Sequence, residues 1–208
     1  MKTAPGADTP FKAAEDTARL PYQLPFPANA QKEIVVAAAI PDDERVWVPQ
    51  APGVHFRPLC LNAAQGYWVN LLRVRKAGIL SRHRHPAPVH GLVLRGRWHY
   101  LEHDWVATEG SYVFEPPGET HTLVVPNDVP EMITQFHITG AMIYVDPWGA
   151  QTGYEDVFSK IDMCRKHYAD CGLGAGYVGR WSARPAGTTA ADLGSCRDGA
   201  RGCRPCDP

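Results

Sequence analysis

The chain has 208 residues, with 21 basic and 22 acidic side chains and a formal net charge of −1. This length suits one domain with a sizeable core. The balanced charge argues against the basic surface that nucleic-acid binding requires. The longest apolar run, 34–40, is too short to cross a bilayer, and the first residues lack the pattern of a signal peptide. We therefore expect a cytoplasmic protein without nucleic-acid or membrane partners.

The first two segments of the sequence differ in composition. Residues 1–40 are rich in Pro, Ala and charge and predict an N-terminal arm. Residues 41–150 contain short segments of β-branched and aromatic residues separated by Gly and Pro. The expected strands are 67–74, 90–96, 97–103, 111–115, 121–125, 132–138 and 141–146. Many short strands without a helical period between them predict an all-β sandwich or small barrel.

One helix is expected after the strands, within 151–181. Apolar residues recur there every three or four positions, at Val157, Ile161, Cys164 and Tyr168. Thr152 and Glu155 fit a capping box at the start of this helix, and Gly172 fits its end. Beyond it, 182–208 has no aromatic residue and too little apolar area to fold, which predicts a disordered tail.

Histidines mark the candidate site. The stretch "SRHRHPAPVHG" holds His83, His85 and His90. Side chains alternate along a strand, so His83 and His85 point to the same side. A second stretch, "GSYVFEPPGETH", ends in His121 after a rigid Pro-Pro-Gly turn. A single histidine is usually a hydrogen-bonded core residue, but neutral imidazoles that meet are common ligands of transition metals.

The two stretches together resemble the motifs of the cupin superfamily. The second fits G-x5-P-x-G-x2-H at Gly110, Pro116, Gly118 and His121. The first resembles the companion motif, with H-x-H at His83 and His85 and a closing Gly96. The resemblance implies a small β-barrel in which His83, His85 and His121 bind one metal ion. Counted from Gly96, the position of the motif's Glu ligand falls on Val89, and His90 faces away from the ion. The resemblance thus implies three histidines and no carboxylate.

Three imidazoles suit Zn, Cu, Fe or Ni, so the ligands alone do not choose the metal. A zinc hydrolase would also need a general base nearby. A redox enzyme would use iron or copper with open coordination positions. Without a protein carboxylate, the ion would favour an anionic, chelating substrate such as a diketone, an enediolate or a hydroxyketone.

A closer resemblance covers residues 40–180, including "FRPLCLN", "QGYWVNLLRVRKAGILSRHRHPAPVHGLVLRGRWHYLEHDW" and "YEDVFSKIDMCRKHY". The protein resembles the 2,4′-dihydroxyacetophenone dioxygenase family. The resemblance implies one non-haem Fe(II) per subunit and cleavage, by O2, of the bond between the carbonyl and hydroxymethyl carbons of an aromatic hydroxyketone. The implied products are 4-hydroxybenzoate and formate.

Further roles rest on proximity in sequence alone. Glu102 and His90 are candidates for the base that deprotonates the substrate. Trp98 and Tyr100 share a strand face with Glu102 and would line the substrate pocket if that face points inward. If the face points outward, they are packing or interface residues. The alternatives are a diketone dioxygenase or quercetinase-like enzyme, and a non-catalytic cupin that binds a metal or ligand. We expect a homodimer or homotetramer.

Overall fold

The computed structural model describes residues 20–27, 30–31 and 33–182. Apart from Ser182, the predicted tail lies outside the described residues, as does most of the predicted arm. The described part contains one α-helix, α1 (Val157–Asp170), and the 3-10 helices η1 (Glu44–Val46) and η2 (Ala175–Arg180). The strands are β1 (Val48–Ala51), β2 (Val54–Asn62), β3 (Tyr67–Val74), β4 (Gly78–Arg84), β5 (Val89–Arg95), β6 (Arg97–Tyr100), β7 (Ala107–Thr108), β8 (Tyr112–Glu115), β9 (Thr120–Val125), β10 (Met132–Thr139), β11 (Ala141–Val145) and β12 (Gln151–Asp156).

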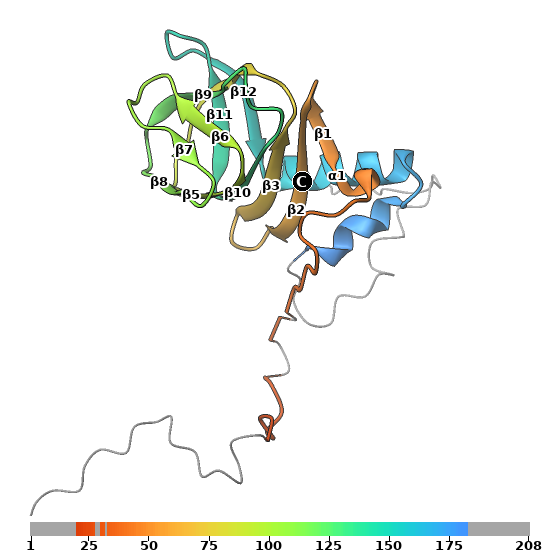
Figure 1. Cartoon of the computed structure of the whole chain (residues 1–208). Coiled ribbons are helices and arrows are strands. Elements are labelled where there is room, and N and C mark those ends of the chain that lie inside the picture. Colours follow the sequence, from red (N-terminus) through yellow and green to blue (C-terminus); the bar gives the residue numbers. More distant parts are fainter. Residues whose placement is uncertain (1–19, 28–29, 32, 183–208) are drawn as a thin grey trace, which may run out of the picture.

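The strands form two antiparallel sheets that face each other (Figure 1). Sheet A has the order β1-β2-β3-β10-β5-β8, and sheet B the order β12-β11-β4-β9-β6-β7. Side chains alternate between the interior and the outer face, as in β5, where Val89, Gly91 and Val93 are buried between less buried neighbours. This arrangement confirms the predicted all-β, cupin-like fold with one C-terminal helix.

The helix α1 packs against β1, β2 and β12 (Figure 1). Its cap differs from the prediction, because Thr152 and Glu155 belong to β12 rather than to a capping box. Asp156 caps the helix instead, and its side chain and that of Ser159 bond each other's backbone N–H groups. At the other end Gly172 has a φ of +81°, which agrees with the predicted stop.

A second difference concerns the strand predicted for 97–103. The strand β6 ends at Tyr100, and the backbone turns at Leu101 and Glu102. Trp98 and Tyr100 are buried and therefore point inward, but Glu102 does not share their face. In the described part of the protein, no helix is long and apolar enough to span a membrane.

The turn between β5 and β6 depends on Gly96, whose φ is +73°. A Cβ at this position would lie 2.5 Å from the backbone oxygen of Glu131. We expect Gly96→Ala to lower the free energy of unfolding by about 3 kcal/mol or more, from left-handed strain plus overlap. Gly110→Ala is the matched control, because its φ is +85° but nothing lies within 4 Å.

Strain alone should cost Gly110→Ala about 1–2 kcal/mol. Urea unfolding of both variants measures the difference. Equal losses in the two variants would contradict a specific role for the close approach at Gly96.

Candidate metal centre

The three predicted histidines meet on the inner face of sheet B. His83 on β4 and His121 on β9 are direct cross-strand partners, and His85 follows β4. The turn before β9 is hydrogen-bonded to the residue that follows β4, because the N–H of Gly118 donates to the carbonyl oxygen of His85 at 2.8 Å. The H-x-H pattern and the Pro-Pro-Gly turn therefore bring ligands that are far apart in sequence to one place.

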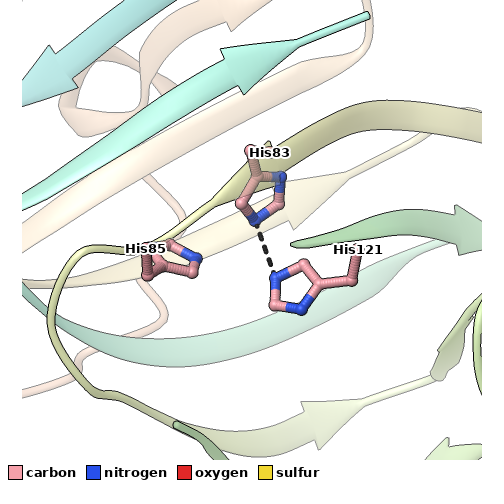
Figure 2. A group of neighbouring side chains, drawn as sticks. All are labelled: His83, His85 and His121. Atoms are coloured by element: carbon pink, nitrogen blue, oxygen red, sulfur yellow. Dashed lines mark hydrogen bonds between the residues drawn. The ribbon is translucent and has the colours of Figure 1, made fainter. Parts of the chain in front are cut away.

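The imidazole rings converge (Figure 2). The Nε2 atoms of His83 and His121 are 3.2 Å apart, and one candidate ligand atom from each of the three histidines lies within 4.8 Å of the others. Nδ1–H of His85 donates to the carbonyl oxygen of Ala141 at 3.2 Å, and Nδ1 of His83 lies 3.1 Å from Ser81 Oγ. Bonds of this kind fix the ring and the tautomer and direct Nε2 toward the site, where the Nε2 atoms of His83 and His121 are within hydrogen-bond distance of each other.

Burial favours the neutral imidazoles that metal binding requires. His83, His85 and His121 are at most 4% exposed. Burial, and then repulsion from His85 and His121, lowers the pKa of His83 well below its usual value. Burial also lowers the pKa of His121, although nearby carboxylates oppose the effect.

A carboxylate lies beside the histidines, whereas the sequence predicted a site with three histidines and no carboxylate. Glu115, at the end of β8, is 2% exposed, and its Oε2 lies 3.3 Å from His85 Nε2 and 3.4 Å from His121 Nε2. Glu115 is the cross-strand partner of Val89, the position at which the cupin motif would place its Glu. The acidic group that β5 lacks is thus supplied by the neighbouring strand.

Tyr100 holds this carboxylate in place. Its hydroxyl donates to Glu115 Oε1 at 2.6 Å, and its ring stacks on His121 with centroids 3.8 Å apart and planes 6° from parallel. Burial, and then the charge of Glu115, raises the pKa of Tyr100, so the phenol remains a donor. Burial raises the pKa of Glu115, but contact with His85 and the nearby His121 outweigh it and lower the value overall. Glu115 Oε2 has no hydrogen-bond partner among the described residues.

The site opens into a pocket of about 470 Å³ between the two sheets. Its apolar wall includes Leu72, Leu80, Val89, Leu123, Phe136, Ile138 and Met142. This volume is in the range of pockets that bind small ligands. The Nε1 of Trp68 and the Oδ1 of Asn70, two more residues of the wall, have no hydrogen-bond partner within the described part. The pocket therefore combines an apolar body with a few buried polar groups.

The other predicted site residues lie in different places. Tyr100 lines the pocket, but Trp98, Glu102 and His90 do not. Trp98 is a core residue whose Nε1–H donates to Thr134 Oγ1 at 3.0 Å. Glu102 accepts bonds from the backbone N–H and the hydroxyl of Thr122.

His90 lies on the outer side of sheet A, because Val89 and Gly91 on either side of it are buried. Its Nδ1 is 2.7 Å from the hydroxyl of Tyr112. The predicted bases Glu102 and His90 are thus engaged outside the pocket. Glu115 was missed because it has no assigned place in the motif, although it directly precedes the motif's Pro116.

The donor set fits a transition-metal ion. Two nitrogens that each lie about 2.1 Å from one ion are about 3 Å apart when their bonds meet near a right angle. The separation of 3.2 Å between His83 Nε2 and His121 Nε2 agrees with this value. The unpartnered Oε2 of Glu115 beside them adds an anionic group that offsets the charge of a cation.

Solved structures with the same fold include three that are informative. An RmlC-like cupin protein from Ralstonia eutropha JMP134 is 26% identical, with a TM-score of 0.56 over 67% of this chain and 85% of its own. A cupin-like protein of unknown function from the same organism is 23% identical, with a TM-score of 0.56 over 58% and 75%. Acetylacetone dioxygenase from Acinetobacter johnsonii is 16% identical, with a TM-score of 0.53 over 64% and 95%.

No curated protein matches the sequence. At identities below 25%, the structural matches speak for the fold alone. The family model described as ChrR Cupin-like domain matches residues 35–144, which is more than half of the 208 residues. The protein belongs to the ChrR cupin-like domain family.

Proposed function

We propose that this protein is a non-haem Fe(II) dioxygenase that cleaves the bond between the carbonyl and hydroxymethyl carbons of 2,4′-dihydroxyacetophenone and yields 4-hydroxybenzoate and formate. The observation that carries the proposal is the convergence of three buried imidazoles and one carboxylate on a mainly apolar pocket. The resemblance over residues 40–180 supports the choice of substrate. Membership of the family establishes the fold but does not specify a reaction.

The residues that would hold the metal are His83, His85 and His121. An iron ion bound by three histidines has coordination positions to spare, and it would supply the activation of O2 and the polarisation of the substrate carbonyl. Glu115 would place an anionic side chain beside the ion. A substrate that binds as an anion is then favoured less strongly than at a site without a carboxylate.

The pocket walls would orient the substrate. Val89, Phe136 and Ile138 from sheet A and Leu80 and Met142 from sheet B line the pocket, and an aromatic ring would pack against them. Burial of the ring between these walls excludes water from the bond that breaks. The hydroxymethyl ketone would then lie at the histidines, with the ring directed into the apolar part of the pocket.

Glu115 is the best-placed group to take the proton of the substrate's hydroxymethyl group, and it replaces Glu102 and His90 in that role. Glu115 is buried beside the histidines, and an ionised carboxylate at this place can accept a proton. Its free oxygen, Oε2, is on the side of the histidines, while Oε1 is held by the hydroxyl of Tyr100. Cleavage between the carbonyl and hydroxymethyl carbons then places one atom of O2 in each product.

The test is oxygen uptake by the full-length protein reconstituted with Fe(II), with 2,4′-dihydroxyacetophenone as the substrate. The proposal predicts one formate and one 4-hydroxybenzoate for each O2 consumed. Acetylacetone in the same assay tests the diketone alternative. No uptake by iron-loaded protein with the hydroxyketone would refute the proposed reaction, and uptake with acetylacetone alone would reassign the enzyme to diketones.

We also propose that the protein is a homodimer or homotetramer. The outer face of β5 and β8 supports this, because Leu92, Tyr112 and Phe114 are between 38% and 63% exposed. Apolar patches of this kind are typical of protein interfaces. Light scattering coupled to size exclusion measures the mass directly, and a monomer at micromolar concentration would refute the proposal.

A further inference from the structure

A second polar cluster lines the same pocket, and the proposed reaction does not use it. We call it the Lys160 cluster; it consists of Gln50 on β1, Tyr144 on β11, Glu155 on β12 and Lys160 on α1. The side chain of Lys160 is 2% exposed and that of Glu155 is 13% exposed. A buried ion pair in the wall of a ligand pocket is a candidate for function.

Three donors of the cluster converge on a single oxygen. Glu155 Oε2 accepts from Lys160 Nζ at 2.7 Å, from the Tyr144 hydroxyl at 2.9 Å and from Gln50 Nε2 at 3.2 Å. Lys160 Nζ also donates to Gln50 Oε1 at 3.1 Å and lies 4.4 Å from the centre of the Phe56 ring. The three contacts to Glu155 all end on Oε2, and this residue lines the pocket, so Oε1 is the oxygen with which a ligand could bond.

The cluster lies close to the metal centre. Tyr144 is the cross-strand partner of His83, and the centroids of the two rings are 6.2 Å apart. Glu155 is on the next strand, opposite Met142, which also lines the pocket. A small planar molecule at the histidines can therefore extend toward the Lys160 cluster without leaving the pocket.

The charges of the cluster select the ligand group. As an ion pair, Lys160 and Glu155 carry no net charge, and the free acceptor belongs to Glu155. A carboxylate group on a ligand would meet the negative charge of Glu155, whereas a neutral hydroxyl would donate to Oε1 in a charge-assisted bond. A purely structural role would not require charge, because apolar residues of similar volume often replace a buried ion pair without loss of stability.

We propose that the Lys160 cluster binds a hydroxyl group on the end of the substrate that is remote from the metal. The preferred ligands are then small aryl ketones with a ring hydroxyl rather than the unsubstituted aryl ketones. This specificity rests on the proposed function for the orientation of the ligand, with its ketone at the histidines. The cluster acts by binding and positioning, and it takes no part in bond cleavage.

Two pairs of molecules that differ only in the ring hydroxyl test the proposal. The first pair, 4-hydroxyacetophenone and acetophenone, lacks the hydroxymethyl group and reports binding without turnover. Calorimetry on iron-loaded protein should show that 4-hydroxyacetophenone binds about 10-fold more tightly or better, as expected for a hydrogen bond to a charged group. The second pair, 2,4′-dihydroxyacetophenone and 2-hydroxyacetophenone, should show a similar ratio of kcat/KM in oxygen uptake.

The double variant Glu155→Leu/Lys160→Met removes the ion pair and keeps the side-chain volumes close. Its dissociation constants for the two members of the first pair should differ by no more than about 3-fold, because the hydroxylated ligand binds more weakly than it does to the wild type. The matched control is Lys166→Met/Asp170→Leu, which removes an exposed ion pair with an N–O distance of 2.6 Å from the same helix. The control should retain the full preference. Should the double variant fail to fold, Glu155→Gln keeps the size of the side chain and should reduce the preference at least about 3-fold, because an amide oxygen accepts more weakly than a carboxylate.

The outcomes separate this inference from the proposed function. A binding preference that disappears with the ion pair, together with no oxygen uptake by the wild type, would retain the hydroxyl site and refute the reaction. Oxygen uptake with no preference in the wild type would refute the hydroxyl site and retain the reaction. A preference that persists in the double variant would also overturn the inference.

Discussion

Replacing His121 with alanine should abolish tight iron binding and, with it, oxygen uptake. His121 is completely buried and would share a bound ion with His83, whose Nε2 is 3.2 Å away. Loss of a group that only orients a metal-binding side chain typically weakens metal affinity about 10–100-fold. Loss of a metal-binding side chain itself should therefore weaken metal affinity about 100-fold or more. Metal analysis after dialysis, together with titration of Fe(II) into the metal-free protein, measures the effect.

His137→Ala is the matched control for this variant. His137 is on β10 and packs against the Tyr67 ring, and it does not line the pocket. The control should keep both its iron and its activity. Since His121 also stacks on Tyr100, the unfolding of the metal-free variant has to be measured as well. A folded His121→Ala protein that retains iron at the wild-type affinity would contradict the three-histidine site.

The second large effect is expected for Glu115→Gln. The amide has the size of the carboxylate and can still accept the hydrogen bond from the Tyr100 hydroxyl. It cannot take up a proton, so kcat should fall by about 100-fold or more while iron remains bound. Steady-state oxygen uptake and metal content, measured on the same preparation, separate the two properties.

Glu109→Gln serves as the control, because Glu109 is exposed in the turn before β8 and should tolerate the change. Two results would contradict the role assigned to Glu115. Activity near that of the wild type would mean that no carboxylate is needed at this position. Loss of iron from the variant would mean that Glu115 holds the metal rather than the substrate's proton.

The histidines could be predicted from the sequence because their geometry is local. An H-x-H pattern in a strand places both imidazoles on one face, and the Pro-Pro-Gly turn defines where β9 begins. His121 then follows at a fixed distance from this turn. The motif register counted from Gly96 placed His90 on the face opposite to Val89, and in the structure Val89 is buried while His90 lies on the outer side.

Glu115 was missed for a physical reason. In β8 the polar residue is buried, while Tyr112 and Phe114 are more than half exposed, which inverts the usual pattern of apolar residues inside. Burial of this carboxylate is possible because Tyr100 donates to it and the histidines, or their metal, lie beside it. Such compensation comes from other strands and has no signal in the segment itself.

The Lys160 cluster also could not be predicted from the sequence. Its residues come from β1, β11, β12 and α1, and no motif joins them. The Thr152–Glu155 pair even fits a capping box, yet pairing of β12 with β11 extends the strand to Asp156. Glu155 then faces Lys160 as a pocket residue. Local propensity allowed either start for the helix, and the tertiary pairing of β12 decided between them.

In the proposed reaction, one atom of O2 enters each of the two products formed from one aryl hydroxyketone in the histidine pocket. The most direct test is turnover of 2,4′-dihydroxyacetophenone by the iron-loaded protein under oxygen-18-labelled O2, with mass analysis of both products. We expect one labelled oxygen atom in formate and one in 4-hydroxybenzoate. Products that contain only oxygen from water, or label confined to one of them, would contradict the proposed dioxygenase reaction.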